Sequence, residues 1–284
     1  MEIINRRQRM VSLTRKLRRE NKSIGLVPTM GALHAGHLSL VKQARQSSDI
    51  VIVSIFVNPS QFNDDRDLQA YPRDLPSDAA MLAQYDVDYI FAPDASEIYG
   101  KGFSTHVYVD DLGDTLEGAS RPGHFRGVAT IITILFIATR PDFAFFGQKD
   151  AQQITVIRRL ARDLGFDTEI VVMPTLREES GLAMSSRNER LSQDERIRAA
   201  VLFRALNEAE ASFKGGERKA SKLTEIVQRT IAQEPQATID HIAVIDSATL
   251  RPIEKIGDTE ALIALAATFG DVRLIDNVVL NRRQ

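Results

Sequence analysis

The sequence predicts an α/β protein, with a Rossmann-like, doubly wound parallel sheet in the first domain and a second, smaller α+β domain after it. In residues 1–175, short β-branched runs alternate with segments of helix length, as parallel strands do when crossover helices join them. After residue 175, two long helical patterns precede three strand-like runs. We therefore expect two domains, residues 1–175 and 176–284, with a hinge near Pro174–Gly181.

The elements of the first domain follow from hydrophobic periodicity. Met10, Leu13 and Leu17 recur at helical spacing, with arginine and lysine on the other faces, so the first helix is amphipathic. The Asp49–Val57 run is rich in β-branched residues, which is typical of a strand buried on both faces. The predicted helices are residues 8–20, 38–47, 75–84, 127–139 and 151–164, and the predicted strands are residues 23–28, 49–57, 88–92, 143–146 and 168–173.

Two long connections interrupt this alternation. Asn58–Asp74 is polar and contains Pro59 and Pro72, so we expect a loop at the carboxyl end of the second strand. Pro93–Gly127 is rich in glycine and has no regular pattern, which indicates an irregular segment that covers the site as a loop or lid. In open α/β sheets, ligands bind at the carboxyl ends of the strands, beside such connections.

The second domain begins with a helix that has a clear start signal. Ser192 and Glu195 have the spacing of a capping box, and the long helix that they open is expected to end near Gly215–Gly216. A second helix is predicted over residues 217–233. Three strands, residues 239–245, 261–268 and 272–280, follow with turns between them, so they are predicted to be antiparallel.

Composition limits the classes of function. The chain has 36 basic and 38 acidic residues, a formal net charge of −2, whereas a nucleic-acid-binding protein usually has a basic excess. It has no cysteine, which excludes disulfides and thiolate chemistry and is compatible with the reducing cytoplasm. The amino terminus lacks the apolar run of a signal peptide, and no uncharged apolar stretch reaches the ~18 residues of a membrane span. We expect a cytoplasmic protein with neither nucleic-acid nor membrane partners.

The most informative segment is Val27–His37, where an apolar strand meets glycines and histidines before a helix. If that helix begins near His34, its free N–H groups and the positive end of its dipole favour an anion such as a triphosphate. His34 and His37 are three residues apart, so both imidazoles face one side of the first turn and can donate to one phosphate. A strand-to-helix turn with ordinary surface histidines is the alternative, but two of the five histidines of the chain lie here.

Two further motifs follow predicted strands. Asn58 and Gln61 offer neutral amides that can hold a hydroxy acid, although such residues in a loop are commonly no more than turn residues. Lys149 can neutralise phosphate, and Asp150 can accept from ribose hydroxyls or support a metal. The alternative for this pair is a charged helix start.

A last motif stands at the start of the second domain. Met184–Arg187 carries two hydroxyls and a guanidinium, which suit a triphosphate that is gripped and then released. Because this motif lies beyond the hinge from the histidines, we expect it to complete the phosphate site when the domains close.

Together these motifs resemble those of nucleotidyltransferases and class I aminoacyl-tRNA synthetases, and more closely those of the pantothenate synthetase (pantoate–beta-alanine ligase) family of the HxGH nucleotidyltransferase superfamily. The resemblance covers essentially the whole chain, with motifs in the family's order and spacing at residues 28–37, 55–62, 116–127, 146–150 and 181–188. In that family, ATP and pantoate form pantoyl adenylate and pyrophosphate, and beta-alanine then attacks to give pantothenate (vitamin B5, the precursor of coenzyme A) and AMP. The resemblance also implies a requirement for Mg²⁺ and a cytoplasmic homodimer.

The resemblance implies roles for residues at matching positions. His37 is the expected proton donor, with His34 and Lys149 as further catalytic groups. The expected pantoate-binding residues are Asn58, Gln61 and Gln153, and Gln61 also contacts beta-alanine. The expected ATP-binding residues are Met30, Gly31, Ala32, Leu33, His34, Ala35, Gly36, His37, Gly147, Gln148, Lys149, Asp150, Leu176, Met184, Ser185, Ser186 and Arg187.

Three positions depart from the family pattern. Ser180 stands before Gly181 where family members usually carry aspartate, and Ile134 and Ile137 stand where lysine and asparagine are common. The first change is expected to alter loop closure, and the other two the outer or dimer-facing surface of the apolar helix. None touches the motifs, so we expect activity to survive.

Two other functions stay open on the residues alone. A related nucleotidyltransferase would move a whole nucleotide onto a phosphate acceptor, and would have little use for the amides of Asn58 and Gln61. A non-catalytic protein on the same fold would bind ATP without turnover. The sequence leaves the metal ligands and the base that accepts the amine proton unassigned.

Overall fold

The computed structural model describes residues 1–281, and these form two compact units. Unit 1 comprises Met1–Gly147 and Val156–Met173. Unit 2 comprises Gln148–Thr155 and the described residues from Pro174 onward. The segment Gln148–Thr155 therefore packs with unit 2, although it precedes Pro174 in the chain.

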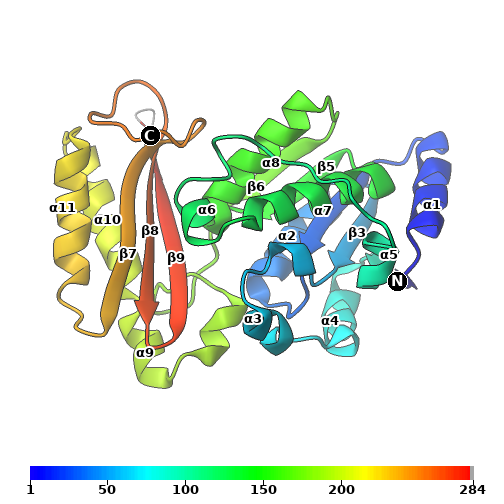
Figure 1. Cartoon of the computed structure of the whole chain (residues 1–284), viewed down its shortest axis with the longest axis horizontal. Helices are drawn as coiled ribbons and strands as arrows, with labels where there is room; N and C mark the ends of the chain where they lie inside the picture. The colour runs from blue at the N-terminus through cyan, green and yellow to red at the C-terminus, as the bar shows by residue number, and fades with distance from the viewer. Residues whose placement is uncertain (282–284) are drawn as a thin grey trace. The chain divides into compact units, whose positions relative to one another are not determined.

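Unit 1 contains a six-stranded parallel sheet in the order β1-β4-β3-β2-β5-β6 (Figure 1). The strands are β1 (Glu2–Ile4), β2 (Ile24–Thr29), β3 (Ile50–Ile55), β4 (Tyr89–Phe91), β5 (Phe143–Gly147) and β6 (Glu169–Met173). The chain moves from β2 to β3 and β4 in one direction, and then continues with β5 and β6 on the other side of β2. The predicted doubly wound parallel sheet is confirmed, and its strand order reverses between β2 and β5.

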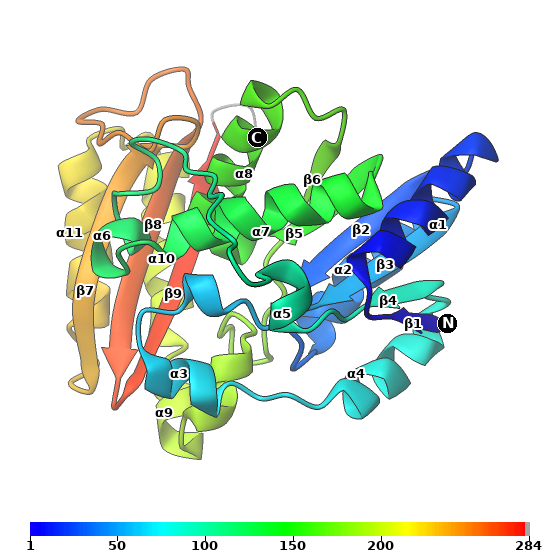
Figure 2. The same ribbon diagram turned by 45° about the vertical axis from the view of Figure 1, so that its right-hand side comes forward.

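Helices cover both faces of this sheet (Figure 2). The longer ones are α1 (Arg7–Arg19), α2 (Ala35–Ser47), α4 (Leu75–Leu82), α7 (His124–Thr139) and α8 (Ala151–Asp163). On one face, Val41 of α2 and Leu82 of α4 share a buried core with Val27 and Val53 of the sheet. On the other face, α1 and α7 lie side by side. All five were predicted, but α2 and α7 each begin three residues earlier than expected.

Two features of unit 1 were not predicted. β1 is only three residues long, too short for a period-two pattern, and it forms by pairing with β4. The expected loop Asn58–Asp74 contains the 3₁₀ turn η1 (Pro59–Gln61) and the short helix α3 (Asp65–Ala70). The prediction of an unbroken loop is wrong because α3 depends on a cap, in which the Asp64 side chain accepts from Arg66 N, rather than on an apolar face.

The Pro93–Gly127 connection is largely irregular, as predicted. It contains the short helices α5 (Ala95–Ile98) and α6 (Glu117–Ser120), and its last four residues belong to α7. It is tied to α7, where Thr130 Oγ1 accepts from Val107 N at 3.0 Å. Of the two departures on α7, Ile134 is half-buried and Ile137 is 57% exposed.

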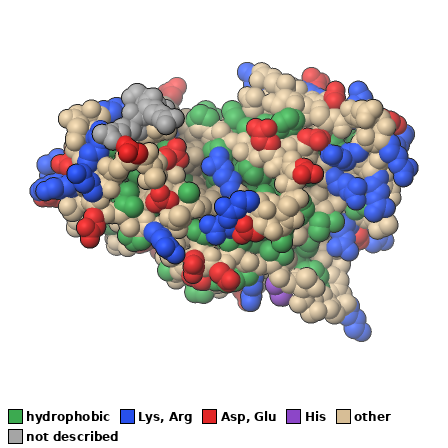
Figure 3. Space-filling model, turned by 90° about the horizontal axis from the view of Figure 1, so that it is seen from above, with side chains coloured by type: hydrophobic (Ala, Val, Ile, Leu, Met, Phe, Trp, Pro, Cys, Tyr) green, Lys and Arg blue, Asp and Glu red, His purple; other side chains and the backbone are tan. Residues whose placement is uncertain are grey.

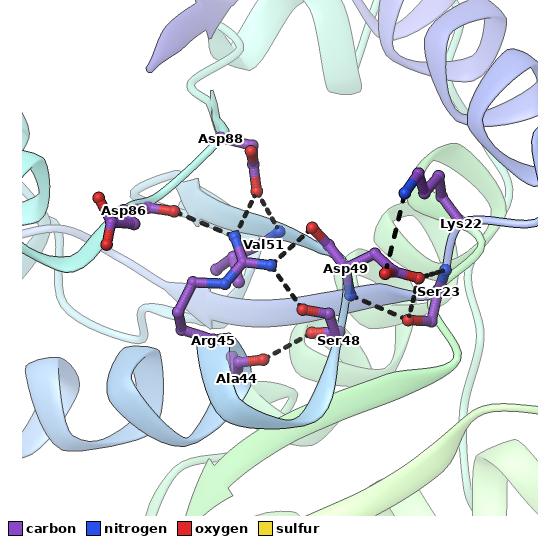
Figure 4. Close-up of polar contacts among 9 residues, drawn as sticks. All are labelled: Lys22, Ser23, Ala44, Arg45, Ser48, Asp49, Val51, Asp86 and Asp88. Carbon is purple, nitrogen blue, oxygen red and sulfur yellow. Dashed lines mark hydrogen bonds and ion pairs between the residues drawn. The ribbon is translucent and has the colours of Figure 1, made fainter.

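The amino edge of the sheet is held by a network around Arg45, at the end of α2 (Figure 4). Its guanidinium donates to the backbone oxygens of Ser48 and Asp49 and to the carboxylate of Asp88, which also accepts from Val51 N. The pKa of Asp49 is lowered, first by hydrogen bonds from Ser23. These contacts stabilise the carboxyl end of α2 and the amino ends of β2 and β3. They lie opposite the carboxyl edge of the sheet, where α/β proteins bind their ligands.

Unit 2 contains a three-stranded antiparallel sheet covered by helices. Its strands are β7 (Ala237–Asp246), β8 (Ala261–Phe269) and β9 (Val272–Leu280), in that order across the sheet. All three are antiparallel to their neighbours, as predicted. The helices α10 (Val201–Lys214) and α11 (Ala220–Ile231) lie side by side (Figure 1). They share one core with the sheet, in which Leu206 and Leu223 meet Ile263 and Leu274. The predicted α+β class of the second, smaller domain is confirmed.

The predicted long helix after Ser192 is wrong in one respect. Its capping box is present, but the helix is interrupted between α9 (Gln193–Arg198) and α10. Ala199 and Ala200 keep right-handed helical dihedrals, while Leu202 N donates to Ala199 O, so the ladder tightens to i→i−3 bonds there. α11 begins at Ala220 rather than at residue 217, because Ala220 N donates to Glu254 O.

No helix among residues 1–281 is both long and apolar enough to span a membrane. Basic and acidic side chains are both spread over the face shown in Figure 3, in agreement with the formal net charge of −2.

Candidate active site

The turn that follows β2 lies where the strand order reverses. β2 pairs with β3 along its whole length, but its ladder with β5 joins only Gly25 to Phe143 and Leu26 to Ala144. Pro28 has no N–H for such a ladder. The ladder therefore ends before the carboxyl ends of β2 and β5, at the position where open α/β sheets bind their ligands.

A buried carboxylate holds the turn Met30–Leu33. Gly31 and Ala32 have φ values of +81° and +50°, in the left-handed region. The Asp78 carboxylate accepts from Ala32 N at 3.2 Å and from Leu33 N at 2.8 Å. A Cβ on Gly31 would lie 2.9 Å from Asp78 Oδ2, so glycine is required here.

Asp78 was given no role in the sequence analysis, yet it is only 3% exposed. Burial raises the pKa of Asp78, and the two backbone hydrogen bonds oppose that shift. No local pattern connects Asp78 with a turn 45 residues earlier in the chain, so only the fold reveals this contact.

His34 and His37 cap the amino end of α2 reciprocally. Gly36 N donates to His34 Nδ1 at 3.1 Å, and His34 N donates to His37 Nδ1 at 3.3 Å. A backbone N–H can only donate, so each Nδ1 presents a lone pair and each neutral ring carries its proton on Nε2. α2 therefore begins directly after His34, which is its N-cap, and meets the condition set for an anion site at this turn. Both rings have Nε2–H as the donor that they can offer an anion.

The second predicted pair, Asn58 and Gln61, is also brought to this turn. Both are buried, at 1% and 8% exposure, and Asn58 Nδ2 donates to Gln61 Oε1 at 3.0 Å and to Gly127 O at 3.1 Å. Tyr99 Oη donates to Asn58 Oδ1 at 2.6 Å. Gln61 Nε2 lies 2.9 Å from Met30 Sδ, so the two motifs meet at Gln61 and Met30. In this structure Asn58 orients Gln61.

The start of α7 fixes the backbone of Gln61. His124 Nδ1 lies 2.8 Å from Gln61 O, and because a carbonyl can only accept, this nitrogen carries the proton. Arg121 Nη2 donates to the same oxygen at 3.3 Å. A Cβ on Gly127 would lie 2.4 Å from Ser60 O, so α7 approaches η1 closely only through glycine. The residues 116–127 motif therefore supports the Gln61 turn.

The Met30 turn lines part of a cavity of about 360 Å³. It lies at the carboxyl ends of β3 and β4, and its lining includes Met30, Gly31, Pro59, Asp78 and Asp94. Movement of the turn would therefore change this cavity.

The Gly147–Asp150 motif begins at the last residue of β5. Gln148–Asp150 forms the 3₁₀ turn η3, which leads directly into α8. Lys149 Nζ lies 3.6 Å from Asp150 Oδ1, with the lysine side chain 19% and the aspartate side chain 48% exposed. Gln153 follows one turn later on α8 and is half-buried.

The Met184–Arg187 motif belongs to a short hairpin in unit 2. Met184 N donates to Leu176 O at 3.0 Å, and Ser180 Oγ accepts from Leu182 N at 3.3 Å. Ser185 caps the 3₁₀ turn η4 (Ser186–Arg190) by accepting from Arg187 N at 3.3 Å. Leu176 is 40% exposed, and Met184 through Arg187 are half-buried, so these side chains are accessible.

The predicted site residues thus fall into two sets. One set, in unit 1, comprises Met30–His37, Asn58 and Gln61, joined by the contact between Gln61 and Met30, and also Gly147 at the end of β5. The other set, in unit 2, comprises the residues from Gln148 to Gln153 together with Leu176 and Met184–Arg187. Within residues 1–281 no group of three or more His, Asp or Glu side chains is arranged to hold a metal ion.

Comparison with known proteins gives a consistent result. A family model described as pantoate-beta-alanine ligase matches residues 2–279. Pantothenate synthetase of Heliobacterium modesticaldum is 49% identical over 280 residues, covering 99% of both chains, and that of Moorella thermoacetica is 51% identical over 263 residues, covering 93% of both.

Solved structures agree with this match. The crystal structure of pantothenate synthetase from Thermus thermophilus superimposes with a TM-score of 0.90 at 41% identity, covering 98% of this chain and 99% of that one. A pantoate-beta-alanine ligase from Francisella tularensis, complexed with beta-gamma ATP and beta-alanine, gives a TM-score of 0.80 at 37% identity, covering 98% and 97%.

Proposed function

Because the chain belongs to the pantoate-beta-alanine ligase family, it is an amide-forming ligase, and we propose that it condenses (R)-pantoate with beta-alanine through a pantoyl adenylate. ATP is consumed, and pantothenate, AMP and pyrophosphate are released. The observation that carries the residue-level proposal is the pair of histidine Nε2 donors at the start of α2, in a turn whose first residue, Met30, contacts the buried amide of Gln61.

In the first step, a carboxylate oxygen of pantoate attacks the α-phosphorus of ATP, and the bond to the bridging oxygen of pyrophosphate breaks. The nucleophile is already ionised, so this step needs neutralisation of phosphate charge rather than a base. Lys149 and Arg187 would supply positive charge, and Nε2–H of His34 and His37 would donate to phosphate oxygens, with His37 as the proton donor. We propose that Met30–His37, Gly147–Asp150, Leu176 and Met184–Arg187 bind the nucleotide.

In the second step, the amine of beta-alanine attacks the acyl carbon of the adenylate, and AMP leaves. Only the neutral amine is nucleophilic, so its proton must be transferred to a base or to water. The acyl phosphate is prone to hydrolysis, and the irregular segment Pro93–Gly127 and residues 176–284 would act as a cover that excludes water.

Neutral amides suit the acid substrate. We propose that Asn58, Gln61 and Gln153 bind pantoate, and that Gln61 also contacts beta-alanine. The support is that Asn58 and Met30 hold the side-chain amide of Gln61, while His124 and Arg121 hold its backbone oxygen, so the amide is oriented before substrate arrives.

Mg²⁺ fits this site as an ion that arrives with ATP. Magnesium commonly binds through one or two carboxylates together with substrate phosphates, and Asp150 is a half-exposed carboxylate next to Lys149. When bound, the ion supplies charge neutralisation on the phosphates. We also propose that the enzyme is a cytoplasmic homodimer with only small-molecule substrates as partners, as the family resemblance implies.

The direct test is to incubate the purified protein with ATP, Mg²⁺, pantoate and beta-alanine, and to identify the products by mass. The expected products are pantothenate and AMP in equal amounts. Transfer of a whole nucleotide onto an acceptor would support the nucleotidyltransferase alternative, and ATP binding without turnover would support the non-catalytic one.

A further inference from the structure

Two adjacent residues on β9, Asp276 and Asn277, contact both of the proposed nucleotide segments of unit 2. Their exposures are 3% and 5%, and neither was singled out in the sequence analysis. Successive side chains of a strand point to opposite faces, so neighbours can reach two different segments. Polar groups buried this deeply destabilise a protein unless they are paired. The hydrogen-bonding partners of Asp276 and Asn277 therefore indicate the role of these two side chains.

The amide of Asn277 is used in full by the segment after β5. Its Nδ2 donates to Gln148 O at 3.0 Å and to Lys149 O at 2.9 Å, and its Oδ1 accepts from Gln148 Nε2 at 3.0 Å. An amide nitrogen has two protons, and here both are committed to consecutive carbonyls. This contact fixes the backbone from which the Lys149 side chain extends.

The carboxylate of Asp276 holds a different segment through an ion pair with Arg177. Arg177 Nη1 lies 2.6 Å from Oδ2 and Nη2 lies 3.0 Å from Oδ1, a bidentate pair in which the arginine side chain is 18% exposed. The guanidinium also lies 4.0 Å above the centre of the Phe203 ring, and Nη1 donates to Gly181 O at 3.1 Å. A planar pair of this kind fixes orientation as well as distance.

Arg177 lies in the first strand of the hairpin that leads into the Met184–Arg187 motif. It forms an antiparallel bridge with Ala183, and its neighbour Leu176 accepts from Met184 N. Fixing Arg177 therefore fixes both Leu176 and Met184.

The contacts of Asp276 and those of Asn277 are linked, because Asn277 N donates to Asp276 Oδ1 at 2.8 Å. We infer that Asp276 and Asn277 are positioning residues that set the spacing between Gln148–Asp150 and the Leu176–Arg187 hairpin for nucleotide binding. The inference rests on the proposed function, in which both segments bind ATP.

The test uses substitutions that keep the side-chain shape. Asn277→Asp replaces the two N–H donors by an oxygen that faces two carbonyls, and Asp276→Asn removes the charge that pairs with Arg177. The affinity for ATP with Mg²⁺ is measured by calorimetric titration without pantoate, and kcat and the KM values for ATP and pantoate are measured separately. Each variant is expected to lose about ten- to hundredfold in ATP affinity, while KM for pantoate changes by less than about twofold.

A matched control is Asp240→Asn, which breaks the Asp240–Arg273 pair between β7 and β9 on the same sheet. Its Nε–Oδ2 distance is 2.6 Å and both side chains are partly exposed, at 29% and 28%, so we expect a change of less than about twofold in ATP affinity.

Folded variants that bind ATP with wild-type affinity would overturn the inference, since a purely stabilising role lowers Tm without changing ATP affinity. Equal losses of affinity for ATP and for pantoate would also overturn it, because the proposed role concerns the nucleotide alone. Asn277→Ala serves as a second variant if Asp276→Asn does not fold, with the same expected loss. Wild-type protein that binds ATP but makes no pantothenate would contradict the proposed function, while the ATP affinities would still decide the inference. Wild-type protein that binds no ATP would overturn both.

Discussion

The histidine turn of unit 1 and the Gln148–Asp150 turn of unit 2 both follow a strand of the parallel sheet, but they are held in different ways. His34, Gly36 and His37 cap one another within four residues. Gln148 and Lys149 are held by Asn277, about 129 residues later in the chain. A site built from local contacts can be recognised in a sequence, whereas one positioned from a distant strand shows only its reactive side chains.

The histidine turn also has distant supports, of which Asp78 holds its backbone. Asp78 accepts from Ala32 N and Leu33 N across about 45 residues, and keeps two residues with positive φ in place. The local cap sets which nitrogens donate, and the distant carboxylate sets where the turn lies. Substitutions at the two kinds of contact should therefore have effects of different size.

The largest effect is expected at the local cap. We expect His37→Ala to lower the rate of adenylate formation on the order of 10²-fold or more, the scale for losing one donor to developing charge, and His34→Ala to act similarly. Rapid quenching of single turnovers gives this rate. His241→Ala, on β7 and outside the segments proposed to bind or cover the substrates, is the control and should leave it unchanged. Full activity in the His37 variant would return that histidine to a purely structural role.

The next effect is expected at Gln61, which joins the two motifs of unit 1. Gln61→Ala leaves Asn58 Nδ2 without one acceptor and removes the amide proposed to hold pantoate, so we expect losses of about 1–3 kcal/mol in both half-reactions. Steady-state kinetics for pantoate and for beta-alanine measure them. Gln69→Ala, on the exposed surface of α3, is the matched control. A loss confined to the second half-reaction would count against the pantoate contact.

A smaller effect is expected at Arg187 in unit 2. Arg187→Ala should weaken ATP binding about tenfold by removing one charged contact, while pantoate binding stays unchanged. Arg190→Ala, at an exposed position of the same 3₁₀ turn, is the control. Equal weakening of pantoate, measured without ATP, would contradict a role confined to the nucleotide.

The smallest effect is expected at Asp78. Burial raises the pKa of Asp78 in the folded chain above its ordinary value of 3.8, so between 3.8 and the raised pKa the folded state binds more protons than the unfolded state. The free energy of unfolding contributed by this group therefore falls as pH rises through that interval. Asp78→Asn should abolish this slope and raise KM for ATP about fivefold, because one backbone N–H loses its acceptor. Denaturant titrations at several pH values, with the exposed Asp65→Asn as control, test the sign of the slope.

Much of the fold was predictable because the longer helices and most strands carry their own period. The three-residue β1 and the helix α3 were missed, since β1 exists only through its partner β4 and α3 through the cap at Asp64. The break at Ala199–Ala200 was missed for a similar reason, because both residues keep helical dihedrals and alanine favours a helix.

In the candidate site, too, the residues with local sequence patterns could be predicted and those without them could not. The residues with reactive groups, such as His34, His37 and Lys149, could be named from motifs. Their supports, such as Asp78 and Asn277, could not, because a lone aspartate or asparagine has no local pattern that distinguishes a buried hydrogen-bonding partner from a surface residue.

The central claim is that the carboxylate of pantoate attacks ATP before the amine enters. Exchange of labelled pyrophosphate into ATP tests it most directly, because exchange requires reversible formation of the adenylate. We expect exchange with pantoate and Mg²⁺ present and beta-alanine absent, and its loss in the His37→Ala variant. Exchange that required beta-alanine but not pantoate would contradict this account, since the amine would then react with ATP first.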